Sequence, residues 1–366
     1  MLVLHVNNRV NNKLNVSGIN TVVDKLVKYQ SKYCNCLEFN LLNNNLLEII
    51  KFFLNINKSS VVVIHRVYEP LSWLVLVLLK IKSVSFAIYL HGAFMPNAQN
   101  KSKFRKKIVN NLLLKYFFKH ANGIFCLTEF EKASFNHFGY GKDNIFVIPN
   151  GIDTFEIDSF YKDKDKDKDK DKDKDKDKDK YKDKYKDKYI LFLGRFDFYG
   201  KGIDILLKSC FELKNLFVEN KFKLIIHGYG NEKAFNLLSE NINKYMLGDV
   251  VEVKGPIFDI DKFAVISNSS ALILPSRSEG FPVSVIEALA LDRFCLLSYS
   301  CNLSDLIDGL NCGLLFDTTE ESLSSVLVEF ITNQNKYIDI NVKDYILNNF
   351  SWDEISRKSL DIYKDF

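Results

Sequence analysis

Four charged side chains in the second half of the sequence could bind a diphosphate and a sugar. Arg195 and Lys201 lie in "GRFDFYGKG", which follows the apolar run "YILFL". An arginine fork beside an ammonium group suits a diphosphate, because the guanidinium can bind it bidentately. Glu279 and Glu287 lie in "EGFPVSVIE", about two helical turns apart, and carboxylates accept hydrogen bonds from sugar hydroxyls. On their own, such residues also fit solvated loop charges and an acidic helix start, so both interpretations stay open here.

Two residues in the first half follow expected strands. Gly18, in "NVSGIN", comes between the first strand and its helix, where a glycine permits a ligand to approach the backbone closely. His91, in "YLHGAF", comes at the carboxyl end of a strand, which is the ligand-binding edge of parallel α/β sheets. A simple loop glycine and a structural histidine are the alternatives.

Short apolar runs alternate with helix-length segments through both halves of the chain. In the first half we expect strands at 2–6, 60–65, 83–90, 123–127 and 145–148, and helices at 19–33, 43–54, 69–81, 103–119 and 128–138. In the second half we expect strands at 189–194, 222–228, 249–253, 270–275 and 294–298, and helices at 203–216, 232–245, 260–267, 282–292 and 319–333. Continuous apolar strands alternating with helices are typical of parallel sheets covered on both faces. The pattern predicts an α/β fold of two doubly wound domains.

A lysine–aspartate repeat separates the two sets. Between Lys162 and Lys188 it holds 14 Lys and 11 Asp, a surplus of three, so the rest of the protein carries only +1 of the formal net charge of +4. The repeat lacks apolar residues other than tyrosine, which predicts a disordered linker over 154–188. We expect domains at 1–153 and 189–345, followed by a C-terminal helix within 346–366.

Composition and spacing argue against several classes of protein. The near-neutral charge outside the repeat gives no overall support for the clustered basic surface that nucleic-acid binding needs. Seven scattered cysteines without a CxxC pair argue against a zinc site or disulfide framework and favour a reducing compartment. Lys80 and Lys82 interrupt the longest apolar stretch, which predicts a buried helix followed by a strand rather than a membrane span. We therefore expect a cytoplasmic protein.

The motifs together resemble those of the retaining, nucleotide-sugar-dependent glycosyltransferases of family 4, which have the GT-B fold of two facing Rossmann-like domains. The resemblance covers most of the chain and rests on "HG" at 91–92, "IPNGID" at 148–153, "GRFDFYGKG" at 194–202, "HGYG" at 227–230, "EGFPVSVIEALA" at 279–290 and "FSWDEISRKSLDIY" at 350–363. It implies an acceptor-side first domain, a second domain that binds the nucleotide sugar, and a last helix that crosses back to the first domain.

The resemblance also implies roles for individual residues. Arg195 and Lys201 would hold the donor diphosphate and neutralise its charge as it leaves, Glu279 would contact the donor sugar, and His91 would sit beside the transferred sugar. The implied donor-binding residues are Gly18, Gly194, Gly228, Gly280, Phe281, Pro282, Val283 and Glu287, the last of them at the ribose hydroxyls. No obligatory metal and no cofactor other than the donor are implied.

The expected function is transfer of a sugar from a nucleotide diphosphate donor to a glycan or lipid-linked acceptor, in cell-surface polysaccharide or lipopolysaccharide biosynthesis. The alternatives are a nucleotide-sugar epimerase on a similar scaffold and a non-catalytic sugar-nucleotide binding protein. The segment 101–119 carries five cations ahead of an apolar helix. It predicts either peripheral contact with the inner face of a membrane or an inward-packed helix with a solvated basic end.

Two positions depart from the resembled pattern near the end of the second acidic motif. Asp292 and Phe294, in "LALDRFCLLS", stand where a Gly and a Pro are usual. Both fall in an expected helix-to-strand turn, away from the charged residues. Near the end of the sequence, Ser351 followed three residues later by Glu354 predicts a helix with Ser351 as N-cap and a capping box.

Overall fold

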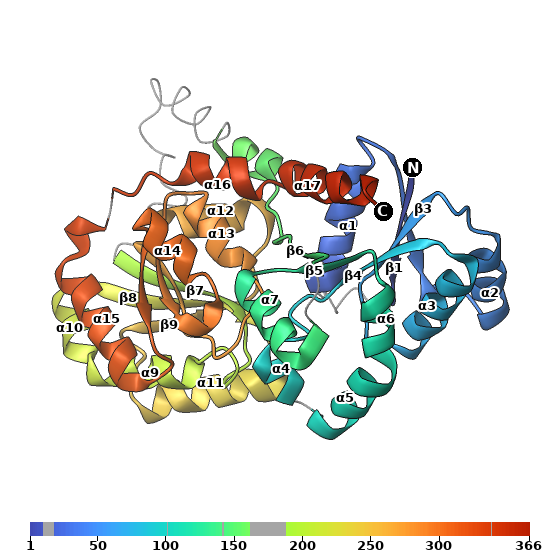
Figure 1. The fold of residues 1–366 in the computed structure, drawn as a ribbon. Coiled ribbons are helices and arrows are strands. Elements are labelled where there is room, and N and C mark those ends of the chain that lie inside the picture. The colour runs from blue at the N-terminus through green and yellow to red at the C-terminus, as the bar shows by residue number, and fades with distance from the viewer. Residues whose placement is uncertain (10–17, 101, 141–142, 162–187, 338) are drawn as a thin grey trace. The chain divides into compact units, whose positions relative to one another are not determined.

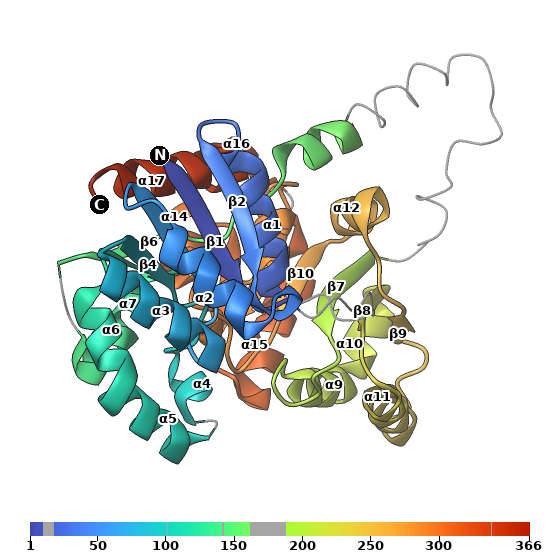
Figure 2. The ribbon, with the colours of Figure 1, turned by 90° about the vertical axis from the view of Figure 1, so that its right-hand side faces the viewer.

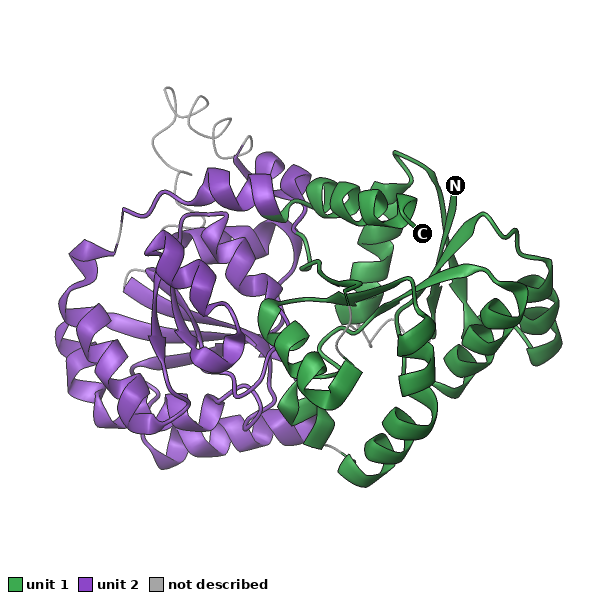
Figure 3. Ribbon diagram, in the orientation of Figure 1, with its two compact units in different colours: residues 1–151, 350–366 green, residues 152–349 purple. Residues whose placement is uncertain are grey.

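The computed structural model describes residues 1–9, 18–100, 102–140, 143–161, 188–337 and 339–366. The chain forms two compact units (Figure 3). Unit 1 comprises Met1–Gly151 and Phe350–Phe366, and unit 2 comprises Ile152–Asn349. The lysine–aspartate repeat lies almost entirely outside the described residues, so its expected role as a spacer stays a prediction.

Unit 1 is built on a parallel sheet. Within its described residues, six strands lie in the order β2-β1-β3-β4-β5-β6 (Figure 1). They are β1 (Leu2–Asn7), β2 (Asn35–Asn40), β3 (Ser60–Ile64), β4 (Ser85–Tyr89), β5 (Gly123–Cys126) and β6 (Ile145–Val147). The order reverses direction after β1, which is the doubly wound pattern.

Helices cover both faces of this sheet. They are α1 (Gly18–Gln30), η1 (Leu41–Asn43), α2 (Leu46–Asn55), α3 (Pro70–Lys82), α4 (Pro96–Asn100), α5 (Lys103–Val109), η2 (Asn110–Leu114), α6 (Lys115–His120), α7 (Glu129–Phe135), η3 (Asn136–Tyr140) and α17 (Trp352–Lys364). Apolar side chains of α2, α3 and α6 share one core, while α1 and α17 share the core of the opposite face. The helix α17 packs along α1 (Figures 1 and 2).

The helix expected over 103–119 is interrupted by a π-helical segment. The segment η2 lies between α5 and α6. Asn110 begins it and is buried, with its side chain accepting a hydrogen bond from the Tyr68 hydroxyl (2.8 Å) and donating one to Gln99 Oε1 (3.0 Å). A π turn lets this polar side chain reach its partners inside the core while the helix continues.

Unit 2 contains a second parallel sheet. Its six strands in the described chain lie in the order β12-β11-β10-β7-β8-β9. They are β7 (Lys188–Arg195), β8 (Phe222–Tyr229), β9 (Val251–Lys254), β10 (Ala271–Leu274), β11 (Phe294–Ser298) and β12 (Gly313–Phe316). The helices are α9 (Ile203–Glu212), α10 (Lys214–Glu219), α11 (Glu232–Lys244), α12 (Asp259–Asn268), α13 (Val283–Leu289), η4 (Tyr299–Cys301), α14 (Ser304–Leu310), α15 (Glu320–Thr332), η5 (Gln334–Lys336) and α16 (Lys343–Phe350).

The prediction of two doubly wound α/β domains is confirmed. The apolar stretch with Lys80 and Lys82 forms the helix α3 followed by the strand β4. No helix in the described residues is long and apolar enough to cross a membrane. Of the predicted capping box, the N-cap half is present, since the Ser351 side chain accepts a hydrogen bond from Glu354 N. The Glu354 carboxylate pairs instead with Arg357 and Lys358.

The structure differs from the sequence-based expectation at 154–161. These residues, which we expected to begin an unstructured linker, are helical. Ile157 and Phe160 lie three residues apart on one side of the helix, and both are buried. Burial of these two apolar side chains stabilises the segment ahead of the repeat.

Candidate donor site

The predicted donor site of unit 2 begins where β7 ends. Arg195 is the last residue of β7 and is exposed, and within the described residues its side chain makes no ion pair or hydrogen bond. Gly194 pairs with Gly228 of the neighbouring strand β8. A Cβ added at Gly228 would lie 1.9 Å from the carbonyl oxygen of Gly194, so the close approach of these strands requires glycine. The backbone that carries Arg195 is therefore a rigid strand end.

A tight loop follows and positions Lys201. Lys201 N donates to Asp197 O (2.8 Å), and Gly200 N donates to Asp197 Oδ1 (3.0 Å). Gly202 then turns the chain into α9 with a φ of +68°. A Cβ at Gly202 would lie 1.9 Å from Pro275 O, so the loop packs directly against the end of β10.

This packing brings Lys201 to the first acidic residue. Lys201 Nζ lies 2.5 Å from Glu279 Oε1, and the two side chains are only 18% and 12% exposed. Ser276 Oγ donates to the same carboxylate oxygen (2.5 Å), and Asn302 Nδ2 donates to Glu279 O (2.7 Å). Three segments of unit 2, the loop with Lys201, the loop that follows β10 and the turn with Asn302, thus hold Glu279 and its cation.

The second acidic residue has a cation of its own. Glu287 lies on α13, and its Oε1 is 2.6 Å from Lys262 Nζ of α12. Pro282 is the N-cap residue of α13, and Val283 is its first residue. Phe281 is buried, which anchors the loop that carries Gly280. Glu279 and Glu287 therefore each form an ion pair with a lysine of unit 2.

In unit 1 the predicted residues lie at the carboxyl ends of strands or at a helix start. Gly18 is the first residue of α1, and a Cβ there would meet no atom of the described residues within 4 Å. His91 follows β4 with a φ of +51°, and its ring stacks on those of His65 and Tyr89. Glu131 is buried beneath this region and accepts a hydrogen bond from Leu127 N, and burial raises its pKa to about 7.

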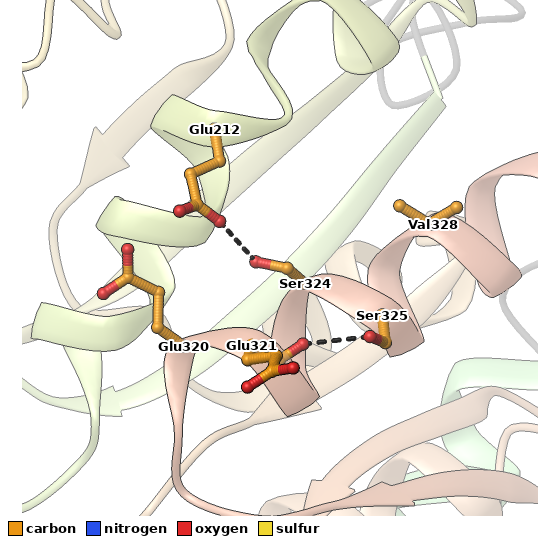
Figure 4. Close-up of a pocket in the computed structure, with 6 residues that line it drawn as sticks. All are labelled: Glu212, Glu320, Glu321, Ser324, Ser325 and Val328. Atoms are coloured by element: carbon orange, nitrogen blue, oxygen red, sulfur yellow. Dashed lines mark hydrogen bonds between the residues drawn. The ribbon is translucent and has the colours of Figure 1, made fainter.

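A separate pocket in unit 2 contains none of the predicted residues. Its volume is about 670 Å³, and it lies between the end of α9 and the first turns of α15 (Figure 4). Glu212, Glu320 and Glu321 contribute three carboxylates to its lining. These carboxylates would repel a diphosphate, so this pocket is a poor candidate for the donor.

Several site residues were not found by the sequence reasoning. Lys262 and Ser276 contact the two acidic residues directly, but an isolated lysine in a helix and a serine in a loop have no distinctive spacing. His5 and His65 hydrogen-bond in series with His91 inside unit 1. One signal was available for them, since both stand in or directly after apolar strands, where a polar side chain is unusual.

Within the described residues, no group of three or more His, Cys, Asp and Glu side chains is arranged to hold a metal ion. The charged side chains described at the donor site are the cations of Arg195, Lys201 and Lys262 and the carboxylates of Glu279 and Glu287.

Comparison with known families and proteins agrees with these observations. Residues 173–344 match the model of glycosyl transferases group 1, and residues 17–155 match that of glycosyltransferase family 4. An uncharacterized glycosyltransferase of Methanocaldococcus jannaschii is 25% identical over 85% of this chain and 77% of its own length. A second uncharacterized glycosyltransferase of that organism is 29% identical over 48% of this chain, and the match spans only 43% of the relative.

Solved structures share the fold. The Anabaena protein HepE, in complex with UDP-glucose, superposes with a TM-score of 0.72 over 100% of both chains at 13% identity. The sucrose-phosphate synthase of Thermosynechococcus elongatus has a TM-score of 0.71 at 15% identity, over 100% of this chain and 98% of the synthase. With both halves matched by glycosyltransferase models and both units folded as Rossmann-like sheets, the chain belongs to the family 4 glycosyltransferases of the GT-B fold.

Proposed function

We propose that the protein is a retaining, metal-independent glycosyltransferase of the hexosyltransferase type, which uses a nucleotide diphosphate-sugar as donor. The observation that carries the proposal is the assembled group of Lys201, Glu279 and Ser276, in the loops that follow Arg195 and β10. The matched HepE structure contains UDP-glucose, which supports a nucleotide sugar as the donor class. The family models and relatives give no support to the epimerase alternative.

The geometry suggests how the site works. Glu279 keeps the Lys201 ammonium at the site before the donor binds. A bound diphosphate would compete for that ammonium and for the Arg195 guanidinium, which leaves the Glu279 carboxylate to accept hydrogen bonds from the sugar. As the glycosidic bond breaks, negative charge grows on the departing diphosphate, and the two cations stabilise it. This role of the cations is why we propose transfer without a metal.

The other predicted residues complete the proposal. Glu287 would bind the ribose hydroxyls, while the glycines Gly18, Gly194, Gly228 and Gly280 would allow close approach of the donor. The open space around Gly18 supports this for the phosphates. His91 keeps its proposed place beside the transferred sugar.

Nucleoside diphosphates test the donor proposal directly. We expect at least one of UDP, GDP and ADP, or the corresponding glucose conjugates, to raise the melting temperature of the protein. A ligand at 100 times its Kd adds about 2.7 kcal/mol to the free energy of unfolding. The matching monophosphate should bind less tightly, because it lacks the second phosphate that the two cations contact. Thermal shift measurements with the di- and monophosphate series check this.

Two variants sharpen the measurement. Arg195→Gln should reduce the preference for diphosphate over monophosphate, because it removes one of the two cations. Glu321→Gln, in the separate acidic pocket, should leave binding unchanged and serves as the matched control. The donor proposal is wrong if no nucleotide shifts the melting temperature, or if mono- and diphosphates bind equally well.

We further propose that the acceptor is glycan or lipid-linked and that the protein contacts an anionic membrane through the helices α5 to α6. Phe104, Ile108, Leu112 and Tyr116 recur every four residues and are exposed, with Phe104 at 77% and Leu112 at 79%. Exposed cations lie beside them, namely Lys103, Arg105, Lys107 and Lys115. An exposed apolar stripe flanked by cations matches the interface between acyl chains and anionic headgroups. This surface supports our proposal that the enzyme acts in the cytoplasm, at the inner face of the membrane.

Vesicle sedimentation tests the membrane proposal. The protein should sediment with vesicles containing anionic phospholipid and remain in the supernatant with purely zwitterionic vesicles. Phe104→Ser with Leu112→Ser should lower binding about tenfold or more, since each buried apolar side chain contributes about 1.5–3 kcal/mol. Leu47→Ser on α2, which is also highly exposed, is the matched control and should bind normally. Equal binding of all variants would contradict the proposal.

A further inference from the structure

Three histidines, one from each of three neighbouring strands, form a hydrogen-bonded series inside unit 1. His5 lies in β1, His65 directly follows β3, and His91 lies two residues beyond β4. His5 Nδ1 is 2.7 Å from His65 Nε2, and His65 Nδ1 is 2.8 Å from His91 Nε2. The strand register places each successive histidine two residues nearer the carboxyl edge, so the three rings step diagonally toward that edge.

The inner end of the series is held by Gln30, the last residue of α1. His5 Nε2 is 2.8 Å from Gln30 Oε1, and Gln30 Nε2 donates to Ser359 Oγ of α17 (2.9 Å). His5, Gln30 and Ser359 are all fully buried. We call these five residues, His91, His65, His5, Gln30 and Ser359, the histidine relay.

The orientation of the Gln30 amide follows from its neighbours. Ser359 Oγ donates its hydrogen to Ser356 O (2.9 Å), so its oxygen is left to accept a hydrogen bond from the amide nitrogen. On the other side, the Cys36 thiol donates to Gln30 Oε1 (3.5 Å). With the Ser359 hydroxyl hydrogen on Ser356 O and the Cys36 thiol as donor, the donors and acceptors match when the amide oxygen faces His5.

That orientation sets the protons of all three rings. A neutral imidazole carries one N–H and one lone pair. Because Gln30 Oε1 accepts, His5 must carry its proton on Nε2 and accept at Nδ1. His65 must then donate from Nε2 and accept at Nδ1, and His91 must donate from Nε2. We propose that the histidine relay fixes His91 in the tautomer whose Nδ1 carries a lone pair, with Gln30 and α17 as the elements that set it.

The surroundings keep the three rings neutral and rigid. Burial lowers the pKa of His5 to about 4 and the pKa of His65 well below its usual value. Burial also lowers the pKa of His91, and the nearby positive charge of Arg66 lowers it further. The Arg66 guanidinium is itself held by Asn7 Oδ1 (3.0 Å) and Asn20 Oδ1 (3.1 Å). The left-handed backbone of His91 orients its ring onto the stack formed by His65 and Tyr89.

This tautomer gives His91 a specific chemical role. Nδ1 of His91 has no hydrogen-bond partner among the described residues, and the side chain is partly exposed. It can accept a hydrogen bond from a hydroxyl group but cannot donate one. Resting on the proposed function, the relay makes His91 an acceptor for a sugar hydroxyl. Gln30 acts as a positioning residue, separated from His91 by the side chains of His5 and His65.

Nuclear magnetic resonance of the full chain, with nitrogen-15 in the histidine rings, tests the tautomer without any substrate. In the wild type at neutral pH we expect His5, His65 and His91 to have an unprotonated Nδ1. His227 is an internal reference with the opposite tautomer, protonated on Nδ1, because its Nδ1 donates to Gly255 O (3.0 Å). Signals are assigned from their loss in single histidine variants. A wild-type His91 protonated at Nδ1 overturns the proposal.

Matched variants test what sets the tautomer. Gln30→Glu keeps an oxygen toward His5 and should retain the wild-type pattern. Gln30→Met removes the acceptor, and Ser359→Ala lets the amide reverse, so both should produce a mixture of tautomers at His91. If Gln30→Met does not fold, the His91 tautomer measured in Ser359→Ala alone tests the proposal. An unchanged pattern in both variants overturns the role of Gln30 and α17.

A kinetic measurement separates this inference from the proposed function. If the protein transfers sugar, Gln30→Met should lower kcat about tenfold with an unchanged donor KM, and Gln30→Glu should stay near the wild type. The tautomer pattern is measured independently of turnover. Absence of transfer therefore contradicts the proposed function but not the proposed tautomer of His91. A normal kcat in Gln30→Met overturns the proposal that the relay matters for the role of His91 in transfer.

Discussion

Replacing Lys201 by methionine should lower sugar transfer by about two to three orders of magnitude, while unit 2 remains folded. Methionine has a similar shape, so the variant removes chiefly the charge. Loss of one preorganised group that stabilises transition-state charge costs about 2.7–4 kcal/mol of activation free energy. Transfer from a nucleotide sugar to an acceptor, followed by release of the nucleoside diphosphate, is the measurement.

The structure supplies controls for this variant. Lys208 on α9 is an exposed lysine, paired with Glu320 at 3.3 Å, so Lys208→Met changes the net charge equally and should leave turnover unchanged. Lys201→Met leaves the partly buried Glu279 carboxylate without its cation, although Ser276 still donates to it. Adding Glu279→Gln to Lys201→Met should restore stability without restoring turnover. Recovery of turnover in that double variant would show that the pair has only a structural role.

Gly202→Ala should destabilise unit 2 by about 3 kcal/mol or more. The φ of +68° costs a residue with a Cβ about 1–2 kcal/mol, and the new Cβ would lie 1.9 Å from the Pro275 carbonyl oxygen. This oxygen belongs to the backbone at the end of β10, so it cannot rotate away like a side chain. Chemical denaturation followed by a probe in unit 2 gives the change in unfolding free energy.

Gly309→Ala is the matched control for Gly202→Ala. Gly309 lies within α14, and a Cβ there would meet nothing within 4 Å. The substitution should stabilise unit 2 by about 0.5–1 kcal/mol, because alanine is the better helix former. If Gly202→Ala were as stable as Gly309→Ala, the loop that carries Lys201 would not be held by the contact with Pro275.

The central strands and the edge strands β6 and β9 could be predicted from the sequence, whereas the edge strands β2 and β12 could not. The sequence of β2, "NCLEFN", has few apolar residues, and Cys36 is its one fully buried side chain. An edge strand has only one neighbour, so it needs fewer apolar residues, and the signal for it in the sequence is correspondingly weak.

The placement of the charged candidate residues after a strand and around a helix start could be predicted because they belong to local motifs, but their partners could not. Lys201 and Glu279 are 78 positions apart, and only the close packing at Gly202 joins them. The histidine relay combines residues from positions 5 to 359, and no local spacing reveals such a set. Hydrogen-bond partners are determined by tertiary packing, which local patterns do not encode.

The departure at Asp292 shows how a substitution can keep a conformation. Asp292 adopts a φ of +52°, the left-handed region that favours glycine, the residue usual at this position in the resembled pattern. Its Oδ1 accepts hydrogen bonds from Val342 N (2.8 Å) and Lys343 N (2.9 Å), at the start of α16. The carboxylate therefore compensates for the strained backbone by holding the next helix.

Unit 1 draws residues 350–366 from beyond unit 2, and this has a consequence for synthesis on the ribosome. Trp352, Ile355, Leu360 and Tyr363 complete one core of unit 1, and the Phe366 carbonyl accepts a hydrogen bond from Ser85 Oγ (3.0 Å). Protein chains emerge from the N-terminus, so while unit 2 is being made residues 1–151 lack α17, and the sheet face that α17 shares with α1 is only partly covered. Unit 2 is a continuous segment and can finish folding first. The half made first is thus the half completed last.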